Sequence, residues 1–128
     1  MEWRFGNYRW YILVDNNAAH WNVKAEKQNG NSYTLDWEQH SHNVPANLNK
    51  KWFLLEIFWK LSAERDSLVK VAIDGNTIIT HQGRNRLSNA NKPQYHLFKV
   101  YGENGKIHQY VDDLEIWSDV PCANFPCG

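Results

Sequence analysis

The clearest hydrophobic pattern in the chain lies between Lys50 and Asp74. In the stretch from Trp52 to Ser62 every odd-numbered position is apolar, whereas the even-numbered positions mix aromatic and charged side chains. The odd positions are Phe53, Leu55, Ile57, Trp59 and Leu61, and the even positions include Trp52, Leu54, Glu56, Phe58 and Lys60. Successive side chains of a β-strand point to opposite faces, so this stretch predicts a strand with one face on a core. Its other face is expected to be open to a ligand.

The next stretch predicts a tight hairpin. An apolar run from Leu68 to Asp74 is followed by Asp74-Gly75-Asn76 and then by a β-branched run from Thr77 to His81. An Asp-Gly pair between two strand-like runs is a strong signal for a two-residue turn, because both turn residues need positive φ angles. The chain is therefore expected to run as a β-meander.

Short strand-like segments recur along the whole chain, separated by turn signals rich in Asn, Gly and Pro. The predicted strands are Arg9–Val14, His20–Lys27, Ser32–His42, Trp52–Ser62, Leu68–Asp74, Thr77–His81, Tyr95–Tyr101 and Gln109–Ser118. No segment has convincing helical periodicity. Many short strands with regular turns favour an all-β fold, in which antiparallel strands form a β-sandwich or a barrel.

Length and composition indicate one domain. The chain has 128 residues, of which 42% are hydrophobic, and this is enough for a core. We expect a single β-sandwich domain over residues 1–121 and a C-terminal tail over residues 122–128. The tail holds both cysteines, Cys122 and Cys127, whose spacing permits a small disulfide loop. A reducing compartment would keep them as free thiols.

The charge of the chain argues against two classes of partner. Lys and Arg number 14, Asp and Glu number 14, and the formal net charge is zero. Nothing therefore steers the protein toward nucleic acid or an anionic membrane surface. No apolar run approaches the roughly 20 residues of a membrane helix. The N-terminus lacks the apolar core of a signal peptide, so we expect either a cytoplasmic protein or a secreted one that has lost its leader.

Aromatic residues make up 14% of the chain, including seven Trp. Packing in a small all-β core is one explanation, since aromatic side chains dominate core burial. The other is sugar binding, in which indole and phenol rings lie against the apolar faces of pyranose rings. Any single Trp is more easily explained by packing, and the sequence leaves both roles open.

The stretch from Ser32 to His42 is the main candidate for a binding site. Strict alternation places Tyr33, Leu35, Trp37 and Gln39 on one face and Thr34, Asp36, Glu38, His40 and His42 on the other. Carboxylates and imidazoles in a row could transfer protons to and from a bound sugar, or could share a metal ion. They could equally form the solvated face of a half-buried strand.

Two other groups of residues carry weaker signals. Alternation in Gln109–Ser118 places Asp112 with the apolar side chains, so that it would either accept backbone N–H groups or bind calcium together with Asp113. His81, His96 and His108 are isolated in sequence and are expected at the surface or as caps. No phosphate-binding loop, nucleophile elbow, H-E-x-x-H or CxxC motif occurs, which weakens hydrolase, kinase and nucleotide-binding interpretations.

Four segments together resemble the C-terminal half of bacterial concanavalin A-like jelly rolls, the laminin-G and polysaccharide-lyase-like group. They are Trp52–Ser62, Val69–Gly75, Tyr95–Gly102 and Tyr110–Ile116. The resemblance covers roughly residues 51–121 and implies two packed antiparallel sheets with a concave glycan-binding face. The short chain implies a compact or incomplete jelly roll. A missing N-terminal strand would leave an open sheet edge that a second subunit could cover, giving a homodimer.

The resemblance also implies roles for particular residues. Lyase members carry Gln, His, Arg and Tyr on the concave face, and the nearest matching types here are Gln39, His40, Lys99 and Tyr101. The sequence as a whole favours non-catalytic binding of a carbohydrate. The residues expected to bind it are Asp36, Trp37, Glu38, His40, His42 and Trp52. The alternatives are a small polysaccharide lyase or glucanase-like enzyme, and a structural or oligomeric interaction protein.

Overall fold

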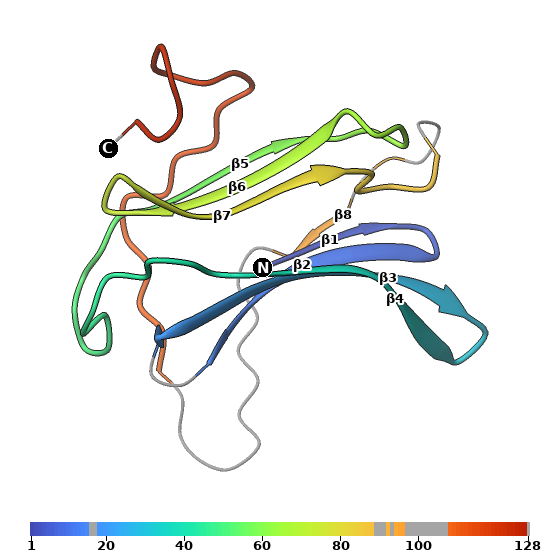
Figure 1. Ribbon diagram of the computed structural model, residues 1–128, viewed down its shortest axis with the longest axis horizontal. Helices are drawn as coiled ribbons and strands as arrows, with labels where there is room; N and C mark the ends of the chain where they lie inside the picture. The colour runs from blue at the N-terminus through green and yellow to red at the C-terminus, as the bar shows by residue number, and fades with distance from the viewer. Residues whose placement is uncertain (16–17, 89–91, 93, 97–107, 128) are drawn as a thin grey trace.

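The protein is a two-layer all-β structure with antiparallel strands (Figure 1). The computed structural model describes residues 1–15, 18–88, 92, 94–96 and 108–127. Its strands are β1 (Glu2–Phe5), β2 (Tyr8–Asp15), β3 (His20–Asn29), β4 (Ser32–His40), β5 (Leu55–Lys60), β6 (Ser67–Ile73), β7 (Asn76–Gly83) and β8 (Gln94–His96). One sheet has five strands in the order β4-β3-β2-β1-β8, and the other has three in the order β5-β6-β7. The prediction of an all-β architecture with two antiparallel sheets is confirmed.

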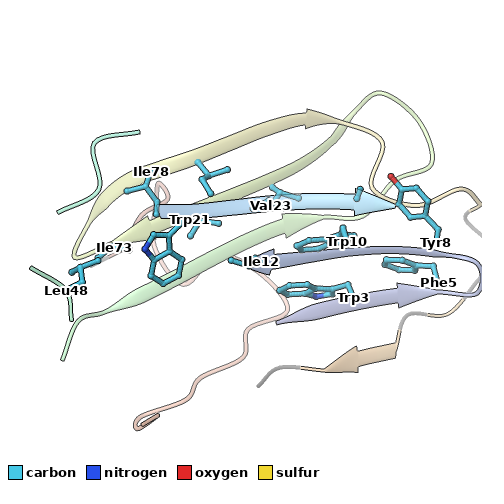
Figure 2. Packing of buried hydrophobic residues seen from close by; sticks show 14 residues of the cluster. Trp3, Phe5, Tyr8, Trp10, Ile12, Trp21, Val23, Leu48, Ile73 and Ile78 are labelled. Atoms are coloured by element: carbon cyan, nitrogen blue, oxygen red, sulfur yellow. The ribbon is translucent and has the colours of Figure 1, made fainter. Parts of the chain in front are cut away.

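The core between the sheets follows the predicted alternation. The odd-numbered residues of the 52–62 stretch pack against the core, as do alternate residues of β1, β2 and β3. The Trp3 and Trp10 rings stack at 3.8 Å between ring centroids, and Trp59 of the opposite sheet meets Trp3 edge-on at 5.2 Å. Figure 2 shows the two stacked rings side by side on β1 and β2. Aromatic packing therefore joins the two layers.

The hairpin between β6 and β7 is also confirmed. Ile73 pairs with Asn76, which leaves Asp74 and Gly75 as a two-residue turn with φ angles of 49° and 76°. Positive φ at both positions is what makes Asp-Gly favourable in this kind of turn. The Asp74 carboxylate also accepts a hydrogen bond of 2.8 Å from the backbone N–H of Leu54, which ties the turn to the chain entering β5.

Two parts of the strand prediction are wrong. Residues 109–118 form no strand, because none of the described strands pairs with them, and their large apolar side chains lie exposed. Strand β1 was not predicted, although the pair Gly6-Asn7 forms the turn that joins it to β2. Four residues are too few to show a clear alternation. Residues 97–101 of the predicted Tyr95–Tyr101 strand lie outside the described part of the chain.

A β-bulge in β4 sets the arrangement of the site. Ala25 of β3 pairs with Trp37, and the next residue, Glu26, pairs with Leu35. Asp36 therefore has no opposite residue in β3. A bulge of this kind reverses the inward and outward alternation of the strand on its two sides. Residues before and after Asp36 thus follow different alternation patterns.

The larger sheet is curved. In Figure 1 the larger sheet bows, so that its strand ends turn away from the smaller sheet and its outer face is concave.

The C-terminal tail is held by a disulfide and by a contact with β5. Cys122 and Cys127 form the disulfide, and the backbone N–H of Cys127 donates to the Glu56 carboxylate on β5 at 2.6 Å. None of the described residues belongs to a helix long and apolar enough to cross a membrane.

Replacing a buried tryptophan should cost far more than replacing an exposed one. Trp10 is fully buried and stacked, whereas Trp52 is 71% exposed. We expect Trp10→Ala to lower the free energy of unfolding by about 3–5 kcal/mol. The matched control Trp52→Ala should change it by less than about 0.5 kcal/mol. Denaturant titration followed by circular dichroism would measure both, and equal losses would contradict this core.

Candidate functional site

The bulge divides the predicted binding residues between two sides of β4. After Asp36, Trp37 lies opposite inward-facing Ala25, whereas Glu38 lies opposite Lys24 on the outer face. His40 lies opposite Asn22 on that same outer face. The prediction that Asp36 shares a face with Glu38 and His40 is therefore wrong, because strict alternation assumes a strand without a bulge.

The outer face of the five-stranded sheet carries a regular array of polar and aromatic side chains. Strand pairing places them in three rows across β2, β3 and β4. The rows are Leu13, Asn22 and His40; Tyr11, Lys24 and Glu38; and Arg9, Glu26 and Leu35. Tyr33 extends the array beyond Leu35, on the far side of the third row. Side chains that lie opposite one another on neighbouring strands are close enough to interact directly.

Arg9 is at the centre of one part of this array. Its guanidinium donates to Glu26 Oε2 at 2.9 Å from Nε and 2.7 Å from Nη2, and the Tyr11 hydroxyl donates to Glu26 Oε1 at 2.8 Å. The same guanidinium lies 3.8 Å from the centroid of the Tyr33 ring. Burial, followed by the hydrogen bond to Glu26, raises the pKa of Tyr11, so this hydroxyl stays protonated and donates. These contacts fix the orientation of two aromatic rings.

Glu38 is at the centre of the other part. Its Oε1 atom lies 3.1 Å from Lys24 Nζ and 3.5 Å from Asn22 Nδ2. His40 Nδ1 lies 2.9 Å from Asn22 Oδ1, and its Nε2 lies 3.6 Å from Glu38 Oε1. The His40 side chain nevertheless keeps 67% of its surface exposed. An amide, a carboxylate, an ammonium group and an imidazole therefore meet on one accessible patch.

Asp36 takes part in a different network on the other side of β4. Arg84 donates to Asp36 at 3.0 Å from Nε and 2.7 Å from Nη2, one bond to each carboxylate oxygen. The buried Tyr8 hydroxyl donates to the same carboxylate at 2.7 Å. The hydrogen bonds from Arg84 lower the pKa of Asp36, and burial raises the pKa of Tyr8. Asp36 is thus an ionised carboxylate held at three points.

Trp37 connects the two sheets at their edge. Its indole N–H donates to the Arg84 carbonyl at 2.7 Å and lies 3.1 Å from the Tyr8 hydroxyl. Its ring stacks on His81 of β7 with 3.6 Å between centroids and 12° between planes. His81 is only 8% exposed, so the expectation of a surface histidine is wrong. An isolated histidine in sequence gives no indication that an indole from the other sheet will cover it.

A pocket of about 730 Å³ opens beside this stack. It lies between β4, β7 and the loop that joins β5 to β6, and its wall includes the Arg84–Asp36 ion pair. The loop that carries Arg84 is anchored by fully buried Asn85, whose side chain accepts from the Ser62 N–H at 2.9 Å and donates to the Lys60 carbonyl at 2.9 Å. The pocket wall is therefore pre-formed.

The other predicted binding residues lie elsewhere. His42 follows the end of β4, and its backbone N–H donates to the Ile78 carbonyl of β7 at 2.8 Å, so it does not join Glu38 and His40. Trp52 is highly exposed and precedes β5 in the other sheet. Gln39 pairs opposite the inward-facing Val23. Lys99 and Tyr101 lie outside the described residues.

The predicted inward position of Asp112 is wrong. Asp112 and Asp113 both lie exposed in the irregular segment that replaces the expected strand. In the part of the chain that the structure describes, no three His, Cys, Asp or Glu side chains come together as a metal site would require. His108 is exposed, as expected.

The sequence analysis missed the part of the outer array that lies on β2 and β3. Arg9, Asn22, Lys24 and Glu26 were not singled out, although the segment from His20 to Lys27 alternates between apolar and polar residues. That alternation was sufficient to place the last three on one face. That Asn22 and Lys24 meet Glu38, and that Arg9 meets Glu26, depended on strand pairing, which the sequence does not specify.

The chain was compared with models of protein families, with curated proteins and with solved structures, and no match was found in any of the three. The resemblance to concanavalin A-like jelly rolls and the homodimer that it implied therefore stay predictions. Function is therefore inferred from the residues of the site itself.

The buried His81 should make stability depend on pH. Burial lowers its pKa below the usual value, and the nearby Asp36 carboxylate only partly opposes this effect. The unfolded chain then binds a proton more readily than the folded one, so stability is lost as pH falls below about 6.5. We expect His81→Gln to flatten the fall in thermal stability between about pH 7 and about pH 5.

The control is His42→Gln, which removes an exposed imidazole and should leave the wild-type slope. Thermal unfolding followed by circular dichroism at a series of pH values would measure all three proteins. An unchanged slope in His81→Gln would show that this imidazole is not responsible.

Proposed function

We propose that this protein binds a carbohydrate, without catalysis, on the outer face of its five-stranded sheet. The ligand would lie across β2, β3 and β4 and contact Asn22, Glu38 and His40 at one end of the face and Tyr33 at the other. In this proposal the sandwich is a compact jelly roll, and the concave outer face visible in Figure 1 is the glycan-binding face.

One observation carries the proposal. The groups around Glu38 are planar or charged hydrogen-bonding groups, and cross-strand contacts hold them in place before any ligand arrives. Sugar hydroxyls both donate and accept, so they pair with carboxylates, amides, imidazoles and ammonium groups alike. A pre-organised site loses less side-chain entropy when the ligand binds.

The aromatic part of the face supports the same ligand. Tyr33 is 40% exposed, and Leu35, which lies beside it on the same face of β4, is 53% exposed. An exposed ring next to small apolar surfaces suits the C–H face of a sugar ring, while the neighbouring Glu26 and Arg9 offer polar contacts. Nucleic acid is a poor alternative, because the positive charges of this face are already paired with carboxylates.

Two substitutions test the polar and aromatic ends of this face. We expect His40→Ala and Tyr33→Ala each to weaken binding of the responsive polysaccharide by about tenfold, or about 1.4 kcal/mol. The matched controls are His42→Ala and Trp52→Ala, which remove the same kinds of side chain elsewhere and should have no effect. Calorimetric titration against a panel of neutral and uronate-containing polysaccharides would measure the affinities.

Incubation with the same panel would reveal turnover if the protein were an enzyme. Binding without product formation is the expected result. Product formation, or weakened binding in the His42→Ala and Trp52→Ala controls instead of the two test variants, would contradict the proposal.

A further inference from the structure

Large apolar side chains are exposed along an acidic stretch near the C-terminus. This stretch, residues 110–117, carries the carboxylates of Asp112, Asp113 and Glu115 and neither Lys nor Arg. We call it the acidic segment. Its apolar side chains keep between 47% and 76% of their surface in solvent, and they are Tyr110, Val111, Leu114, Ile116 and Trp117.

The acidic segment has no partner elsewhere in the described part of its own chain. None of its backbone groups forms a backbone hydrogen bond with a described residue, and none of its carboxylates forms an ion pair with one. Its side-chain hydrogen bonds are internal, from the Asp113 N–H to Asp112 at 2.9 Å and from the Trp117 indole to Glu115 at 3.1 Å. Contiguous exposed apolar surface rimmed by charge is typical of a protein–protein interface.

A second surface, ahead of β5, has the same apolar character and the opposite charge. Trp52 is 71% exposed and Leu54 is 50% exposed, and they follow Lys50 and Lys51 in the chain. Neither lysine forms an ion pair with a described residue. We call residues 50–54 the basic segment. Its unpaired ammonium groups complement the unpaired carboxylates of the acidic segment.

The two segments together hold enough apolar surface for a specific interface. An aromatic side chain buries about 150–250 Å², so the exposed parts of Tyr110, Trp117 and Trp52 amount to roughly 400 Å² per copy of the chain. A standard interface buries about 800 Å² per partner, so these three rings supply about half of what a specific dimer needs. The exposed aliphatic side chains of both segments add to this area.

We propose that the acidic segment of one copy docks on the basic segment of a second copy, so that the protein forms a symmetric dimer. In a twofold interface each copy gives and receives the same contact, so two such contacts form at once. The zero net charge of the chain removes long-range repulsion between the copies. This surface shares no residue with the proposed glycan face, and it is not the open sheet edge that the resemblance implied for a homodimer.

Analytical ultracentrifugation of the full chain measures this association. Exposed ion pairs each contribute little, so the dimer is expected to be weak and to dissociate on dilution. Between about 1 µM and about 500 µM protein we expect a reversible monomer–dimer equilibrium. A chain that stays monomeric over this whole range would overturn the proposal. At the dilutions used for circular dichroism a single copy is the species present, so Trp52→Ala remains a stability control there.

Charge reversal tests whether these two segments meet. Lys50→Glu/Lys51→Glu makes both segments acidic, and Asp112→Lys/Asp113→Lys makes both basic. We expect each variant alone to raise the dissociation constant of the dimer at least about tenfold. An equimolar mixture of the two should dimerise again, because each segment then meets one of opposite charge on the other copy. Only contact between copies gives this rescue, and a mixture that stays monomeric would contradict the proposal.

Matched controls separate this surface from the rest of the molecule. Arg65→Glu/Lys92→Glu makes the same change in net charge at exposed positions outside both segments, and it should leave the dissociation constant at the wild-type value. Leu114 and Leu35 are 56% and 53% exposed, so they form an apolar pair for comparison. We expect Leu114→Ala to weaken the dimer severalfold and Leu35→Ala to have no effect. Equal effects of the two leucine variants, or loss of the dimer in Arg65→Glu/Lys92→Glu, would show that the copies associate through another surface.

Discussion

The arrangement of the outer array and of the Trp37–His81 stack depends on Asp36, which has no opposite residue in the ladder between β3 and β4. The extra residue allows Trp37 to turn inward and reach His81 in the opposite sheet, while Glu38 and His40 still point outward. The side chain of Asp36 has hydrogen-bond partners, because its carboxylate accepts hydrogen bonds from Arg84 and Tyr8. Without these bonds, a carboxylate at a disrupted point of the ladder would be costly.

The aromatic content of the chain is explained mainly by packing. Trp3, Trp10 and Trp21 are buried, and Trp37 and Trp59 pack against the core from the edges of their sheets. A small sandwich has little volume from which to gain burial energy, and large rings bury the most apolar surface per residue. Trp52 and Trp117 remain exposed, so high tryptophan content by itself is a weak sign of sugar binding in a sandwich of this size.

The two sides of β4 differ in how their charges are compensated. On the outer face, carboxylates and cations of neighbouring strands meet at side chains that keep part of their surface in solvent. On the inner side, the ion pair of Arg84 with Asp36 adjoins a buried tyrosine and a stacked indole. The partly exposed charge pairs of the outer face suit a broad surface for an extended ligand. The enclosed ion pair of the inner side suits a small pocket with fixed walls.

The sequence by itself determined the local structure where alternation and turn chemistry agree. Strand β5, which lies inside the predicted 52–62 stretch, its inward residues and the Asp74-Gly75 turn follow from side-chain period and positive φ angles, which are properties of neighbouring residues. Alternation failed at Asp36, because a bulge is produced by pairing with β3, and in residues 109–118, because a strand also needs a partner edge. The tertiary structure alone decided that Glu38 meets Asn22 and Lys24, that Arg84 meets Asp36, and that His81 lies under Trp37. These contacts join residues distant in sequence, so no local pattern could specify them.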